Sequence, residues 1–172
     1  MSHATVRAAV TAFFQPPAVP GLNAMFRAQP IIAGPDRLGL STGGGTGTPG
    51  FGAYGFVHLN ESDESRVTVP YATGSKAVRY VVGLIVIYQW LTVQNTSGVQ
   101  EVDAWVGPLD DLIGGIKDRL RSDPTLGNSD VVFEAGQADN DIRISQDLPR
   151  IDGGVLHSWN LLEFDLTEIV EA

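Results

Sequence analysis

The stretch KAVRYVVGLIVIYQWLTV, from Lys76 to Val93, decides the fold class. It is rich in valine, isoleucine, tyrosine and tryptophan, which are residue types enriched in strands. Its apolar residues do not recur at the three- and four-residue spacing of a helix. Arg79, Gly83 and Gln89 interrupt it, and it is shorter than the roughly 20 apolar residues of a membrane-spanning helix. We therefore expect one long strand inside a sheet, with part of its length beyond the core.

Two helices are predicted on either side of this stretch in the chain. The first runs from Ala4 to Gln15, where Val6, Val10, Phe13 and Phe14 form one apolar stripe before two prolines. The second is the strongest helix signal in the sequence and ends at Ser122-Asp123-Pro124, with Pro108 either kinking it or beginning its main segment. Its apolar residues recur every three or four positions: Val102, Trp105, Val106, Leu109, Leu112, Ile113, Ile116 and Leu120.

Shorter apolar runs predict further strands on both sides of the long one. Phe51–Asn60 and Arg66–Tyr71 flank the polar run Glu61-Ser62-Asp63-Glu64, which is typical of a hairpin with an acidic tip. The adjacent Leu161 and Leu162 predict a bulge or burial on both faces in the last strand. The remaining predicted strands are Ala24–Arg27, Asp130–Ala135, Ile142–Ser145 and Val155–Leu166.

The order of these elements predicts an α+β fold, a mixed and mainly antiparallel sheet flanked by an N-terminal helix and a long central helix. The 172 residues suit one domain, 1–172. Glycine and proline dominate residues 33–55, where Gly43, Gly44 and Gly45 are consecutive. That density of helix and strand breakers predicts a long loop or arm.

Composition excludes several classes of function. The 20 acidic and 11 basic residues give a formal net charge of −9, the wrong sign for binding nucleic acid through its phosphates. The chain has no cysteine, which excludes disulfides and thiolate metal sites and is compatible with a reducing cytoplasm. Residues 1–11 contain no apolar run long enough for a signal peptide. We expect a soluble protein that makes no membrane contact.

No motif predicts a metal or cofactor. Gly45, Gly47 and Gly50 spell G-x-G-x-x-G, but a predicted strand follows where the dinucleotide motif requires a helix. His3, His58 and His157 lack the spacing of a helical zinc site. The acidic runs Glu61–Glu64 and Asp139–Asp141 lack the pattern of a calcium-binding loop.

Catalytic residues are equally scarce. His157 and Ser158 are consecutive in a predicted strand, so their side chains should point to opposite faces and not hydrogen-bond to each other. A catalytic triad would need tertiary contacts that the sequence does not show. Trp90, Trp105 and Trp159 are expected to be core residues or interface anchors. We expect no enzyme, but a protein that assembles with others.

The opening segments Val6-Arg7-Ala8-Ala9-Val10 and Pro16-Pro17-Ala18-Val19-Pro20-Gly21-Leu22 resemble the start of tail terminator proteins of long-tailed (siphovirus-like) bacteriophages of actinobacteria. The order of elements agrees over most of the chain. The resemblance implies a small α/β subunit that forms a hexameric ring. That ring caps the tail tube and joins it to the head–tail connector, so the protein would be made in the host cytoplasm and sit at the head-proximal end of the tail in the virion.

The same resemblance suggests roles for two groups of residues. DNA would pass through the ring without specific binding, and Glu61, Asp63 and Glu64 are candidates for an acidic lumen. The glycine-rich arm with Gly43, Gly44 and Gly45 would order against a neighbouring subunit or the tail tube protein. Two alternatives stay open: a major tail tube or head–tail connector subunit, and a small hydrolase that uses His58 or His157.

Overall fold

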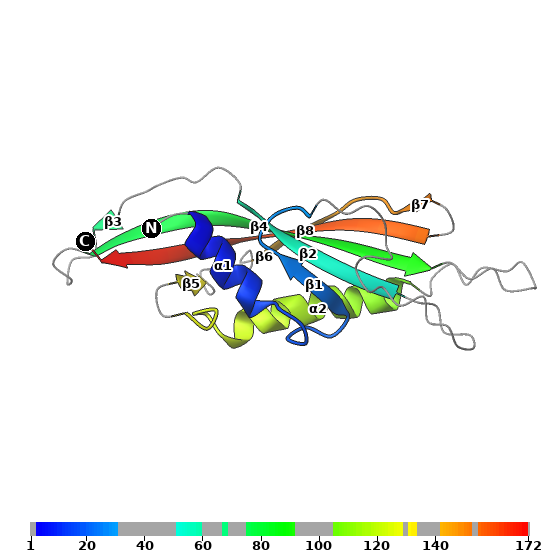
Figure 1. Ribbon diagram of the computed structural model, residues 1–172, viewed down its shortest axis with the longest axis horizontal. Coiled ribbons are helices and arrows are strands. Elements are labelled where there is room, and N and C mark those ends of the chain that lie inside the picture. Colours follow the sequence, from blue (N-terminus) through cyan, green and yellow to red (C-terminus); the bar gives the residue numbers. More distant parts are fainter. Residues whose placement is uncertain are drawn as a thin grey trace, which may run out of the picture.

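Two 17-residue strands, β4 (Ser75–Leu91) and β8 (Val155–Glu171), run the length of the molecule side by side (Figure 1). They pair antiparallel over every residue, from Ser75 opposite Glu171 to Leu91 opposite Val155, with no register shift. The computed structural model describes residues 3–30, 51–59, 67–68, 75–91, 105–128, 131–133, 142–152 and 155–171. The prediction of one long strand inside a sheet is confirmed, because β4 has neighbours on both sides.

The other strands join this pair to form one mixed sheet. β2 (Phe51–Leu59) pairs antiparallel with β4, and β1 (Leu22–Phe26) lies parallel to β2 at one edge. β5 (Val131–Phe133), β6 (Ile142–Gln146) and β7 (Arg150–Asp152) all pair antiparallel with β8 at the other side. The predicted fold class, α+β with a mixed and mainly antiparallel sheet, is therefore confirmed.

Several predicted strand positions were wrong. β3 (Val67–Thr68) pairs with β4, as β2 does, so the described residues of these two strands do not pair with each other in the predicted hairpin. Residues 51–55 belong to β2, which shortens the predicted arm at its end. The last strand continues past Leu166 to Glu171, and residues 150–152 form β7 where a connection was expected. Each error is one of pairing or length, which local residue pattern does not determine.

The core lies on one face of the sheet, where alternate residues of the two long strands are buried. On β4 these are the even-numbered residues from Tyr80 to Trp90, and on β8 their partners from Leu156 to Leu166. Leu84 and Leu162 face each other at its centre and are both fully buried. Because side chains alternate along a strand, the odd-numbered residues lie on the second face.

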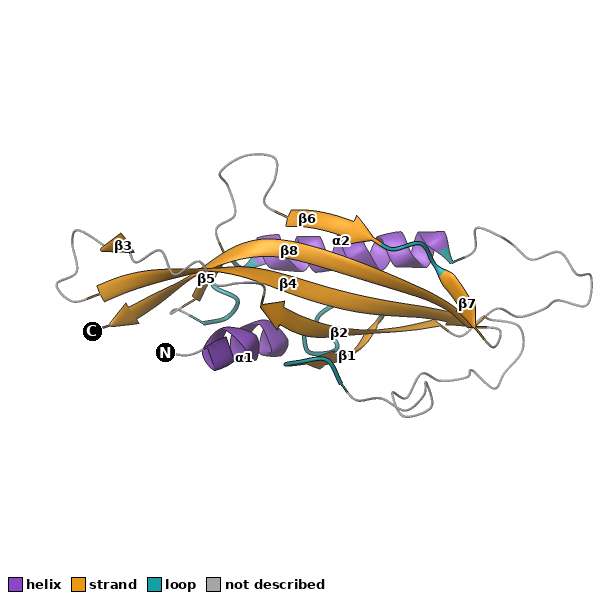
Figure 2. Cartoon of the chain, turned by 90° about the horizontal axis from the view of Figure 1, so that it is seen from above, coloured by secondary structure: helices purple, strands orange, loops and turns teal. Residues whose placement is uncertain are grey.

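Both helices contribute their apolar stripes to this same core. α1 (His3–Phe13) places Val6, Val10 and Phe13 there, as the sequence predicts. α2 (Val106–Ser122) runs alongside β4 and β8 (Figure 2) and begins later than predicted, so Pro108 lies within its first turn, where proline is tolerated. The Arg119 guanidinium of α2 stacks 4.1 Å above the Phe13 ring of α1. Neither helix of the described part is long and apolar enough to cross a membrane.

The turn after α2 is held by Asp123, whose carboxylate accepts three hydrogen bonds. They come from the Thr125 backbone N–H at 2.9 Å, the Thr125 hydroxyl at 2.7 Å and the Gly127 backbone N–H at 3.0 Å. Between those two residues Leu126 adopts a φ of 51° and is nevertheless buried in the core. The turn therefore holds a non-glycine residue in the left-handed region, at a cost that apolar burial offsets.

Asp123 should make the stability of the protein depend on pH. The hydrogen bonds from Thr125 hold the pKa of Asp123 below its usual value, so the charged form stabilises the folded state. This contribution is present at neutral pH and is lost as the pH falls below about 4, through the folded-state pKa. We expect Asp123→Ala to destabilise the protein at pH 7 and less so at pH 3, measured by urea unfolding. An equal loss at both pH values would contradict this.

Candidate assembly surface

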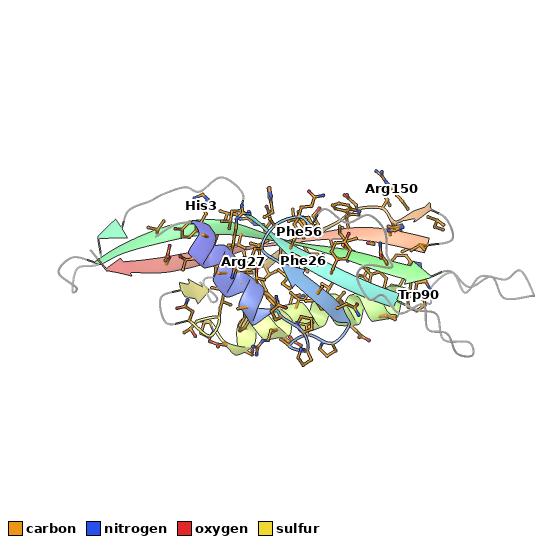
Figure 3. The ribbon with its side chains drawn as sticks, in the orientation of Figure 1. His3, Phe26, Arg27, Phe56, Trp90 and Arg150 are labelled. Carbon is orange, nitrogen blue, oxygen red and sulfur yellow. The ribbon has the colours of Figure 1, made fainter. Side chains whose placement is uncertain are left out.

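The second face of the sheet carries an apolar cluster of its own. Phe56 and Ile87 are each only 3% exposed, yet neither belongs to the core that the two helices cover. Ile85 pairs with Phe56 and with Leu161 on the strands to either side. Phe26 lies beside Phe56 on the neighbouring strand (Figure 3). Its ring meets the Tyr54 ring edge to face, and burial raises the pKa of Tyr54. Both faces of the sheet centre are thus apolar.

A polar row borders this second face at the end of the long strands. Gln89 lies opposite His157, and its Nε2 is 3.2 Å from His157 Nδ1. Arg150 follows on β7 directly opposite His157. Gln89 is buried, and its Oε1 has no hydrogen-bond partner in the part of the chain that the structure describes. A partner that donates a hydrogen bond here would satisfy that oxygen.

A bulge interrupts the edge next to this row. β6 ends with Gln146 opposite Asn160, and β7 starts with Arg150 opposite His157. The three residues 147–149 therefore lie opposite only two residues of β8, 158 and 159. A regular ladder would have two residues here, so one residue is extra. The Asp147 N–H still donates to the Trp159 carbonyl at 2.9 Å, so the strand stays attached through the bulge. Of the two alternatives predicted for Leu161 and Leu162, the bulge is absent from the regular β4–β8 register, whereas burial on both faces holds in part, with Leu162 buried and Leu161 half-buried.

Exposed apolar side chains gather at this bulge. In the described part of the chain, four large hydrophobic residues are exposed, and all lie on β6, on β7, between them, or opposite the bulge. Leu148 is 88% exposed, Ile151 61% and Trp159 43%, with Ile144 as the fourth. We call residues 142–152 together with Trp159 the bulged edge. Ile144 and Ile151 lie on the helix-covered face and Trp159 on the second face, so apolar side chains are exposed on both faces of this edge.

The opposite edge of the sheet is closed by α1. The Gln15 side chain donates from Nε2 to the Met25 carbonyl at 3.0 Å, and Arg7 donates from Nη1 to the Arg27 carbonyl at 3.3 Å. The carbonyls of Met25, in β1, and of Arg27, just after β1, thus accept hydrogen bonds from side chains of the same chain. The two edges differ in kind: one is capped by a helix, and the other presents apolar side chains to solvent.

The structure does not describe the residues that the sequence analysis selects as interface or lumen candidates. Gly43, Gly44, Gly45, Glu61, Asp63 and Glu64 lie outside the described residues.

His58 and His157 lie on the same face of the sheet, the second face. His58 pairs with Gly83 and His157 with Gln89, which are six residues apart on β4, so the two histidines are about 20 Å apart. Ser158 is buried on the helix-covered face beside Asn160, so it points away from His157, as predicted. Among the residues described, no three His, Asp or Glu side chains are placed to hold a metal ion.

The sequence analysis predicts only part of the bulged edge. Trp159 was expected to be a core residue or interface anchor, but Leu148 and Ile151 fell in an expected connection. The signal that could have revealed them is the run IRISQDLPRID, residues 142–152, which alternates from Ile142 to Ser145 and then places Leu148 and Ile151 among polar and charged residues. Such a pattern is typical of a half-exposed strand.

The negative charge of the protein lies outside the framework of helices and strands. The described residues include nine basic and ten acidic positions, a net charge of −1, against −9 for the whole chain. The other segments of the chain therefore carry a net charge of −8. The bulged edge itself holds two arginines and two aspartates and is neutral.

No protein-family model matches this chain, and no curated protein matches it.

Proposed function

We propose that this protein is a structural subunit of a bacteriophage, the tail terminator of a long-tailed actinobacteriophage. Six copies would form a ring that caps the tail tube and joins it to the head–tail connector. The subunit that the resemblance implies has a mixed sheet, flanking N-terminal and central helices, and a glycine-rich arm within residues 33–55 that orders against a neighbour.

The observation that favours an assembly subunit is the bulged edge. Its exposed Leu148, Ile151 and Trp159 are the kind of side chains that protein interfaces bury, and tryptophan, tyrosine and arginine dominate the binding energy of such interfaces. Trp159, Tyr54 and Arg150 supply these three types on the second face. The net charge of −9 also suits a ring through which DNA passes without binding.

Binding to tails tests this proposal. Purified protein is mixed with tails that lack a terminator, and the tail ends are imaged by cryo-electron microscopy. We expect a ring of six subunits at one end, and restored joining of heads. Trp159→Ala should weaken binding to tails by at least tenfold, because an exposed aromatic anchor is lost. Asp118→Ala, exposed on α2, is the matched control and should bind normally.

The alternatives predict different images. Open tubes formed by the protein alone would identify a tail tube subunit, and binding to tail-free heads would identify a head–tail connector subunit. Tails that remain bare at both ends would overturn the terminator. Hydrolase activity that His58→Ala or His157→Ala abolishes, with stability unchanged, would favour the enzyme instead.

A further inference from the structure

We propose that in the free protein the bulged edge pairs antiparallel with the same edge of a second copy. The two-fold axis passes between Asp147 and Leu148. Such a contact is isologous and closes with two copies, so it cannot by itself continue into a ring or a tube. The dimer therefore goes beyond the proposed tail function: it is a form of the protein in which the apolar edge is covered before any partner is met.

In the part of the chain that the structure describes, the bulged edge pairs on one side only, with β8, so its other side is open to a further strand. In an antiparallel ladder, residues whose N–H and C=O face the partner strand alternate with residues whose groups face away. The Asp147 N–H points toward β8, because it donates to the Trp159 carbonyl. The backbone N–H and C=O groups of Ile144 and Gln146 therefore point away from β8. On β7 the same alternation directs the backbone groups of Arg150 toward β8 and those of Ile151 away from it. Ile144 and Ile151 thus direct their backbone groups outward on either side of the bulge.

The bulge makes the edge complementary to itself. Residues seven apart lie on opposite faces of a regular strand, but the extra residue in the bulge brings Ile144 and Ile151 to the same face. Ile144 is opposite Leu162 and Ile151 is opposite Leu156, both on the helix-covered face. Around the proposed axis Ile144 faces Ile151 of the partner subunit. On each side of the axis one Ile144–Ile151 pair forms, and both side chains are buried by the contact.

The charges at the edge match in the same register. Asp147 and Arg150 are both exposed on the second face, opposite Trp159 and His157 respectively. The pairing places Asp147 diagonally across from Arg150 of the partner subunit, a distance that long side chains bridge. The symmetry makes this ion pair twice. Gln146 of the partner subunit lies opposite Pro149, which has no N–H, so the ladder lacks one backbone hydrogen bond on each side of the axis.

A bulge and a proline often protect an edge strand from pairing. A protected edge, however, does not need a leucine that is 88% exposed beside an isoleucine that is 61% exposed. The edge is also neutral, so two copies meet there without net repulsion. The exposed apolar groups and the matched charges favour a second copy as the occupant.

Engineered cysteines test the register cleanly, because the chain has none of its own. In the double variant Ile144→Cys/Ile151→Cys, the two positions of one chain are about 20 Å apart along the strand and cannot bond to each other. Across the axis their Cα atoms would be about 5.5 Å apart, within the range of a disulfide. We expect a covalent dimer after mild oxidation, seen on a non-reducing gel. Each single variant should stay monomeric on that gel.

Light scattering on the unmodified protein gives the second measurement, with an expected mass of twice 18.4 kDa. Arg150→Asp should weaken dimerisation at least tenfold, because it sets two aspartates against each other. The swapped variant Asp147→Arg/Arg150→Asp should restore it. A monomer at every concentration, or a dimer that the paired cysteines do not link, would overturn the inference.

The two proposals fail separately. A six-subunit mass without the cysteine cross-link would overturn the two-fold dimer and leave the tail function standing. A cross-linked dimer whose unmodified form never caps tails would overturn the tail function and support the dimer.

Discussion

Leu162→Ala is expected to lower the free energy of unfolding by about 3 kcal/mol, within the range for leucine truncation in a core. Leu162 is fully buried and faces Leu84 at the centre of the sheet, where both helices cover it. The loss combines the burial of the missing methyl and methylene groups with the cavity that a close-packed core leaves behind. Urea unfolding at pH 7 measures it.

The neighbouring Leu161→Ala is the matched control. The two leucines are adjacent in the chain but lie on opposite faces, and Leu161 is only half-buried beside Ile85 on the second face. We expect Leu161→Ala to cost about 1 kcal/mol, since less apolar area is removed from a surface that can adjust. Equal losses for the two variants would contradict the assignment of the core to the helix-covered face.

Tyr80→Phe is expected to cost about 2 kcal/mol, the cost of leaving a buried acceptor without its hydrogen bond. Glu168 is fully buried, and its Oε2 accepts a hydrogen bond from the Tyr80 hydroxyl at 2.7 Å. The other oxygen, Oε1, has no partner among the described residues. Phenylalanine would therefore leave the carboxylate in an apolar environment without this donor, which is costly. Thermal or urea unfolding measures the change.

A second background separates the hydrogen bond from packing. In Glu168→Leu there is no carboxylate to satisfy, so adding Tyr80→Phe should change stability by less than about 0.5 kcal/mol. Replacing a buried charged group by an apolar one of similar size is itself often neutral or stabilising. If Tyr80→Phe cost as much in the Glu168→Leu background, the loss would not come from the hydrogen bond to Glu168, and the ring contact with His3, at 5.8 Å between centroids, is kept in both variants.

The elements that the sequence predicted well are those set by residues close together in the chain. The apolar stripes of α1 and α2 and the density of β-branched and aromatic residues in β4 are local patterns, and they were sufficient to place these elements to within a few residues. The separation of His157 from Ser158 also followed from local alternation alone.

What the sequence could not determine is which strands meet. The two residues of β3 pair with β4, and β1 pairs with β2 in parallel. β8 extends to Glu171 because β4 continues beside it. The candidate surface depends on the same kind of information. Leu148 and Ile151 become an exposed edge only because β6 and β7 pair with β8 in registers one residue apart.

The sequence by itself therefore determined the class of the fold, its two helices and its central strand, because hydrophobic periodicity acts over a few neighbouring residues. Only the tertiary structure decided the strand order, the two apolar faces and the bulged edge. Strand pairing joins residues far apart in the chain, and a shift of one residue in register exchanges the buried face for the exposed one.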